Sequence, residues 1–147
     1  MSASNVENGI KLKDIYSSLT EFPSHSVTLF VDACFSGGAR NQELVTARGV
    51  KVVPKYDLLK GNIVSFSASS GNQSSYAYTS KNHGMFTYFL LKSIQEANGD
   101  ITYGDMWEKV KNKVSFESVK INSKEQNPQK NIGVEVENEW SKWKFKQ

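Results

Sequence analysis

The residue best suited to chemistry in this chain is its single cysteine, Cys34. A run of apolar and β-branched residues from Val27 to Val31 leads to Asp32, a small residue and this cysteine. Such a short continuous run is typical of a buried strand in a parallel sheet. In open α/β sheets the chemistry lies at the carboxyl ends of strands, where Cys34 falls. Gly37 and Gly38 allow a sharp turn and close approach of a substrate. A small buried hydrophobe is the simpler interpretation of an isolated cysteine, but this context favours a nucleophile.

A cysteine nucleophile needs a base, and the chain has only two histidines, His25 and His83. His25 lies nine positions before Cys34, at the opposite end of the same predicted strand. At about 3.3 Å per residue the strand between them alone accounts for roughly 20 Å, which excludes His25 as the base. His83 comes at a predicted helix start on the correct edge of the sheet. Local packing is its simpler role, and a thiol enzyme that uses Cys34 with His83 is a weaker alternative.

The elements that must position these residues alternate between helical and strand patterns. In chain order they are a helix over 11–20, strands over 27–31 and 62–68, helices over 84–98 and 104–114, a loop over 115–130 and an edge strand over 132–137. Thr102 is the expected N-cap of the last helix. A long polar stretch, 39–61, is expected to be functional or mobile. Trp140, Trp143 and Phe145 are expected to cap an edge of the core. If the two strands are parallel neighbours, residues 67–75 lie beside Cys34.

Composition limits the classes of protein to consider. With 147 residues and 38% hydrophobic residues, the chain is long enough for one domain with its own core. A net charge of +3, with scattered lysines, gives no argument for nucleic acid. One cysteine excludes an intramolecular disulfide. No apolar run approaches the roughly 18 residues of a membrane span, and residues 1–8 lack a signal-peptide core. We therefore expect a cytoplasmic protein without membrane contact, cofactor or metal.

Three motifs give the chain a family resemblance. They are Asp-Ala-Cys-Phe-Ser-Gly at 32–37, Ser-Ala-Ser-Ser-Gly-Asn-Gln-Ser-Ser at 67–75 and His-Gly-Met-Phe-Thr-Tyr-Phe-Leu-Leu at 83–91. In this order they resemble the caspase-like cysteine peptidases, the metacaspase and bacterial branch in particular. Caspases proper carry Gln-Ala-Cys, and Asp32 stands in place of that glutamine. The resemblance covers about residues 9–129. It implies an α/β fold: a caspase-like sandwich with a mostly parallel sheet flanked by helices.

The resemblance also implies roles for individual residues. Cys34 is the implied nucleophile of an endopeptidase, and Asp32 lines the primary specificity pocket. The metacaspase branch uses this acid to bind Arg or Lys, so the implied partner is a peptide or protein substrate with a basic residue before the cut. An ion pair or a turn cap is the structural alternative for Asp32. The remaining implied substrate-binding residues line the cleft, pair with the substrate backbone or shape the pocket loop: Ser67, Ala68, Ser69, Gln73 and Ser74.

The family's catalytic histidine lies roughly 50 residues before the cysteine, whereas only 33 residues precede Cys34 here. The histidine and one oxyanion donor are therefore expected upstream, in a missing N-terminal part of the domain. We expect residues 1–147 to form a single partial domain, incomplete at its N-terminal side and a poor peptidase alone. The alternative is an inactive caspase-like module that binds or scaffolds partners. Strand edges left exposed would also promote a homodimer.

Overall fold

The computed structural model describes residues 10–33, 58–70 and 73–146, and the statements below concern this part of the chain. Its helices are α1 (Leu12–Thr20), α2 (Met85–Glu96) and α3 (Tyr103–Asn122). Its strands are β1 (Val27–Val31), β2 (Ile63–Ser67), β3 (Ala77–Tyr78), β4 (His83–Gly84) and β5 (Gln129–Ile132). The predicted α/β class is confirmed. Cys34 and most of the predicted 39–61 loop lie outside the described residues.

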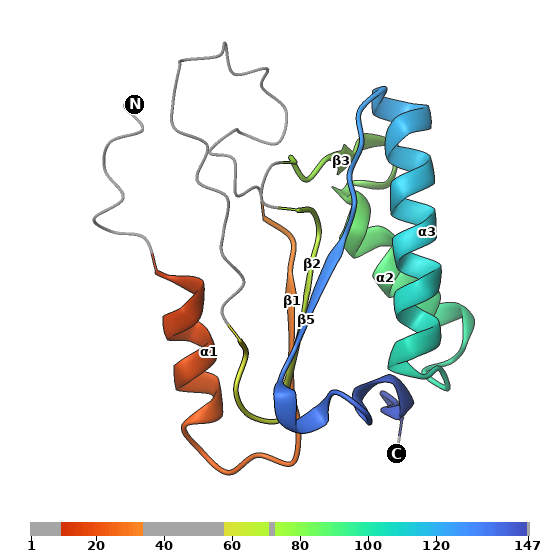
Figure 1. Cartoon of the computed structure of the whole chain (residues 1–147). Helices are drawn as coiled ribbons and strands as arrows, with labels where there is room; N and C mark the ends of the chain where they lie inside the picture. The colour runs from red at the N-terminus through yellow and green to blue at the C-terminus, as the bar shows by residue number, and fades with distance from the viewer. Residues whose placement is uncertain (1–9, 34–57, 71–72, 147) are drawn as a thin grey trace.

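The main sheet has the strand order β1-β2-β5 (Figure 1). β1 and β2 are parallel, with Val27 opposite Ile63 and Val31 opposite Ser67. β5 runs antiparallel to β2, so the described sheet is mixed. The predicted parallel pairing of the two core strands is therefore confirmed, and their carboxyl ends meet at one edge of the sheet.

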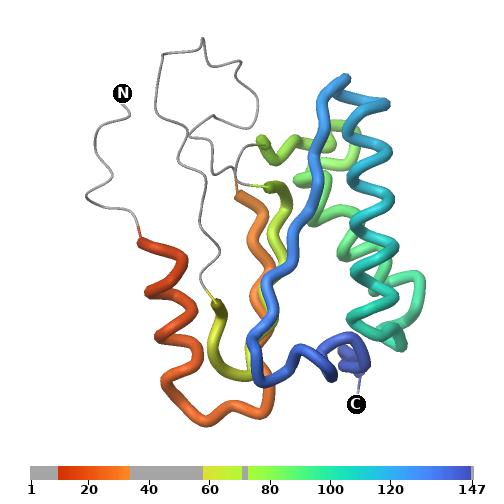
Figure 2. Tube along the Cα trace, viewed as in Figure 1, coloured from red at the N-terminus to blue at the C-terminus, as the bar shows by residue number. Residues whose placement is uncertain are grey.

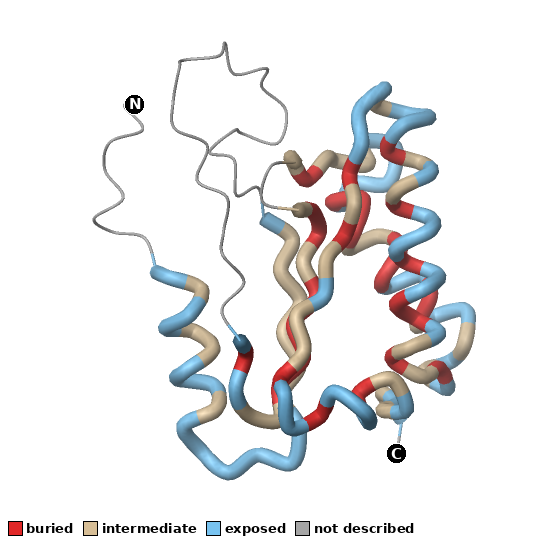
Figure 3. The backbone as a smooth tube through the Cα atoms, in the orientation of Figure 1, coloured by how far each residue is buried: buried red, intermediate tan, exposed pale blue. Residues whose placement is uncertain are grey.

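Helices lie on both sides of this sheet, with α1 on one side and α2 and α3 on the other (Figure 2). The main core forms between β2 and the helix pair, where buried residues concentrate (Figure 3). Val64 and Phe66, two residues apart on β2, both point to this side of the sheet. They pack against the apolar face of α2 and the inner face of α3. The buried apolar residues of the two helices are Met85, Phe86, Phe89, Leu90, Tyr103, Met106, Trp107, Val110 and Val114. Phe66 also contacts Phe30 of β1, with ring centroids 5.4 Å apart.

The C-terminal half departs from the sequence prediction in two places. The predicted loop over 115–130 is wrong, because α3 continues to Asn122. Val110, Val114 and Ser118 are buried at four-residue spacing, but the last of them is polar, while the apolar Phe116, Val119 and Ile121 are exposed. The sequence therefore shows no apolar stripe over this continuation. The C-cap that follows is Ser123, which adopts a left-handed conformation with φ 53° and donates its N–H to the Val119 carbonyl. Thr102 accepts a hydrogen bond from the Asp105 N–H, which confirms it as the N-cap.

The edge strand is also displaced from its predicted place at 132–137. β5 ends at Ile132, and a 3₁₀ turn, Val134–Val136, follows it. Gly133 donates its N–H to the Ile63 carbonyl, and a Cβ there would come 1.9 Å from the Gly61 oxygen. The chain therefore turns at this close approach. The alternating valines Val134 and Val136, which suggested a strand, belong to the 3₁₀ turn instead. The predicted packing of Trp140, Trp143 and Phe145 against the core is confirmed.

Helix α1 is attached to the sheet by Tyr16, whose hydroxyl donates to Ser65 Oγ at 3.0 Å. Burial raises the pKa of Tyr16 above its ordinary value of 10.0, and the hydrogen bond with Ser65 opposes this shift. The unfolded chain therefore loses this proton first, so the contribution of Tyr16 to stability is complete below pH 10 and decreases as the pH rises further. We expect Tyr16→Phe to lower the free energy of unfolding by about 1 kcal/mol at pH 7. Urea titrations should show this difference shrinking above pH 10, and a constant difference would contradict the prediction.

Candidate active site

The candidate site lies where the carboxyl ends of β1 and β2 meet. Asp32 directly follows β1, and its backbone neighbour Val31 accepts a hydrogen bond of 2.9 Å from the Ala68 N–H. This bond extends the β1–β2 pairing by one residue and fixes the loop after β2 beside Asp32. The prediction that the two segments lie side by side concerns Cys34, which lies outside the described residues; what the structure places at the end of β1, next to Asp32, is Ala68.

The Asp32 carboxylate is half-buried and tied to the start of α2. Its Oδ2 accepts two hydrogen bonds from Thr87, one from the hydroxyl at 2.6 Å and one from the backbone N–H at 3.3 Å. Its Oδ1 accepts a hydrogen bond from the buried Ser75 hydroxyl. The N-cap residue of α2, Gly84, has no side chain to cap the helix. Asp32 therefore supplies the anion that a helix N-terminus favours.

The loop after β2 is held by its own hydrogen bonds and by contacts to residues 126–127. Ser69 Oγ donates to the Gln73 carbonyl, and Gln73 Oε1 accepts from the Asn127 N–H at 2.8 Å. The Gln126 side chain donates to the Ala68 carbonyl at 2.9 Å and accepts from the Tyr76 N–H at 2.8 Å. The described residues of the loop thus form a hydrogen-bonded wall beside Asp32.

A family comparison bears directly on this arrangement. The model of the caspase domain family matches residues 1–134, which include every element that forms the site. The chain belongs to the caspase domain family. The comparison with curated proteins finds no match. The chemistry of a cysteine peptidase is therefore the general function of the family to which this site belongs, in agreement with the motif resemblance.

The caspase domain brings the five predicted pocket residues together at one edge, but not on one surface. Ser67, Gln73 and Ser74 are half-buried and keep exposed surface. Ala68 and Ser69 are fully buried, and both backbone groups of Ala68 already have partners. A substrate can therefore contact the first three directly. Ala68 and Ser69 lie beneath the surface of the loop and support it in this conformation.

Sequence reasoning missed three residues that organise the site. Thr87 and Ser75 hold Asp32, and fully buried Gln126 joins the loop to α3 through the hydrogen bond between its N–H and Ser118 Oγ. Thr87 is a hydroxyl in an otherwise apolar first turn, which is a signal that could have identified it. Gln126 is surrounded by polar residues in sequence, so no local pattern distinguishes it.

The two histidines lie apart from one another in the caspase domain. His25 precedes β1, at the end of the strand opposite Asp32, which agrees with its exclusion as the base. His83 belongs to β4 opposite Tyr78, directly before α2, and is exposed. Within the described ranges no three histidine, cysteine, aspartate or glutamate side chains are grouped to hold a metal ion. Among the described residues no helix has the length and apolar character needed to cross a membrane.

Proposed function

We propose that this caspase domain is the nucleophile-bearing part of a cysteine endopeptidase that cuts after Arg or Lys, with Cys34 as the nucleophile. The observation that carries the proposal is the Asp32 carboxylate, two residues before Cys34 and held at the carboxyl edge of the sheet by Ser75 and Thr87. A fixed carboxylate beside the nucleophile selects a guanidinium or ammonium group through charge-assisted hydrogen bonds. In this proposal Ser67, Gln73 and Ser74 border the same pocket.

The contacts of Asp32 refine the expected specificity. A carboxylate offers about four lone-pair positions, and Thr87 and Ser75 already use three. A bidentate arginine would therefore have to displace one of these hydroxyls or the helix N–H. A basic side chain would therefore share the carboxylate with these donors, and a single-point contact, which lysine and arginine can both make, disturbs the fewest of them. We expect kcat/KM for Arg and Lys peptides to agree within about tenfold, which a comparison of two otherwise identical fluorogenic peptides measures.

We further propose that the base histidine comes from an upstream segment that docks along β1. All five residues of β1 are only half-buried, although four are apolar. In the described part of the chain no strand pairs with the other edge of β1. Helix α1 has no buried residue, and its flanking residues Ile10 and Phe22 are 79% and 70% exposed. An added strand on β1 would cover this apolar surface, and a second copy of the chain is the alternative occupant.

A second candidate function is an inactive caspase module that binds partners. The positions of the histidines favour it, because His25 lies at the wrong end of β1 and His83 is exposed. In that case Cys34 would be an ordinary thiol, and the Asp32 contacts would serve only to cap α2. A thiol enzyme based on His83 is the third possibility, and His83→Ala would abolish thiol reactivity only in that enzyme.

The test is the labelling rate of Cys34 by iodoacetamide against pH, with and without a supplied upstream segment that carries the histidine. Because the chain has one cysteine, all label reports on Cys34. We expect the segment to increase labelling below pH 8 relative to the chain in urea, and to allow cleavage of an Arg peptide. Labelling that matches the urea rate in both arms would contradict the peptidase and favour the binding module.

A further inference from the structure

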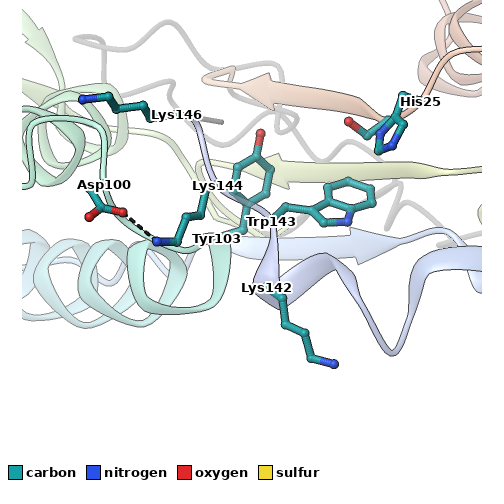
Figure 4. Close-up of a pocket in the computed structure, with 8 residues that line it drawn as sticks. His25, Asp100, Tyr103, Lys142, Trp143, Lys144 and Lys146 are labelled. Atoms are coloured by element: carbon teal, nitrogen blue, oxygen red, sulfur yellow. Dashed lines mark hydrogen bonds and ion pairs between the residues drawn. The ribbon is translucent and has the colours of Figure 1, made fainter.

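A second pocket lies at the other end of β1, away from the candidate active site. It encloses about 590 Å³ between His25 and Ser26, which precede β1, the start of α3, and the C-terminal segment 142–146 (Figure 4). This volume falls within the range of ligand sites in proteins. Its distance from Asp32 along β1 means that the proposed peptidase function does not account for it.

The C-terminal segment presents its side chains alternately. Trp143 and Phe145 are half-buried and pack on Tyr103, with ring centroids 5.9 and 4.6 Å from the tyrosine ring. The Tyr103 N–H donates to the Trp143 carbonyl, and residue 144 forms a bridge to residue 102. The outward positions are all exposed lysines: Lys142, Lys144 and Lys146. The aromatic residues thus anchor a segment whose outer side is uniformly basic.

The charges around this pocket are unbalanced. The one carboxylate that lines it, Asp100, accepts a hydrogen bond of 2.7 Å from Lys144 Nζ. This contact lowers the pKa of Asp100, so the carboxylate stays charged and compensates Lys144. Lys142 and Lys146 form no ion pair with any carboxylate of the described residues. The pocket therefore retains two uncompensated cations on its rim.

The directions of these lysines decide which anion fits. Lys142 and Lys146 point away from each other, so their ammonium groups do not converge (Figure 4). A compact anion such as phosphate needs several donors directed at one point. An extended peptide instead places carboxylates at separated positions along its length. An apolar side chain between two acidic residues would lie against the indole of Trp143.

We propose that this pocket binds an extended acidic peptide segment of a partner protein, with an apolar residue between acidic ones. Charge complementarity on the rim and the aromatic wall that Tyr103 and Trp143 form carry the proposal. The site goes beyond the proposed peptidase function, and it holds equally if the domain is catalytically inactive.

The test is a binding titration of the full chain with an end-capped, fluorescein-labelled peptide in which glutamates alternate with phenylalanine and serine. The variant is the double charge reversal Lys142→Glu and Lys146→Glu. Lys109→Glu with Lys113→Glu, two exposed lysines on α3 away from this pocket, is the control with the same change in net charge. We expect the first double variant to weaken binding by about tenfold or more and the control by less than about twofold.

Three further results would overturn the proposal: equal weakening in both double variants, equally tight binding of a peptide with glutamine in place of glutamate, or displacement of the labelled peptide by equimolar inorganic phosphate. The first would show an effect of net charge alone, and the last a compact-anion site. Iodoacetamide labelling of Cys34 should be unchanged in the Lys142 and Lys146 variant, which separates this site from the proposed active site.

Discussion

Replacing Gln126 by leucine is expected to lower the free energy of unfolding by about 4 kcal/mol. Gln126 is fully buried, and its side chain pairs with the Tyr76 N–H and the Ala68 carbonyl. Leucine has a similar volume but leaves both backbone groups buried without these partners. Each such loss costs about 1–3 kcal/mol. Urea unfolding followed by tryptophan fluorescence measures the difference.

The matched control for this substitution is Gln129→Leu, three residues further along the chain. Gln129 is half-buried, and its amide donates only to the carbonyls of Asn127 and Pro128, close to it in sequence. We expect this change to cost less than about 1 kcal/mol. Equal costs for the two leucine variants would mean that the Gln126 contacts do not stabilise the loop beside Asp32.

Sequence reasoning located correctly the elements whose burial follows from a local pattern of apolar residues. β1 and β2 are short apolar runs, and α2 carries a dense apolar face, so their positions follow from residue type alone. The end of α3 was not predicted because the last buried residue of this helix is Ser118, which is polar. Ser118 is buried because its hydroxyl accepts from the Gln126 N–H, a contact that no periodicity reveals.

The candidate site also contains one residue that sequence reasoning identifies and partners that it does not. Asp32 is recognisable because it sits in a compact motif directly after a strand. Its partners Ser75 and Thr87 lie 43 and 55 residues away in sequence. Which hydroxyl reaches a given carboxylate depends on how α2 docks against the end of β1. That docking is set by core packing across the whole domain, so it is not predictable from either segment alone.

Asp32→Asn is expected to reduce kcat/KM for an Arg peptide by about a hundredfold in the enzyme completed with its upstream segment. Asparagine keeps the shape of the side chain but removes the charge that would pair with guanidinium. Hydrogen bonds to charged groups contribute about 1.5–3 kcal/mol, which corresponds to this change in rate. Cleavage of otherwise identical Arg, Lys, Gln and Asp peptides measures both the loss and any change in preference.

Stability measurements on the same variants separate the two roles that Asp32 has in this interpretation. Asparagine can still accept from Thr87 with its single oxygen, whereas Asp32→Ala leaves the Thr87 N–H and two hydroxyls without this acceptor. We therefore expect the alanine variant to lose about 2–4 kcal/mol of unfolding free energy and the asparagine variant less than half of that. A pure helix cap would show this order of stability with no change in substrate preference.

Thr87→Val provides the converse control, because it removes one hydroxyl donor while the carboxylate and the backbone N–H remain. This variant should lose stability but still prefer basic over acidic substrates, since the charge of Asp32 is intact. An acidic side chain before the cut would meet like-charge repulsion in a half-buried site, so the discrimination depends on that charge. If a folded Asp32→Asn enzyme keeps its Arg preference, or if the Asp peptide is cut best, Asp32 does not determine specificity. Its carboxylate would then act only as the cap of α2.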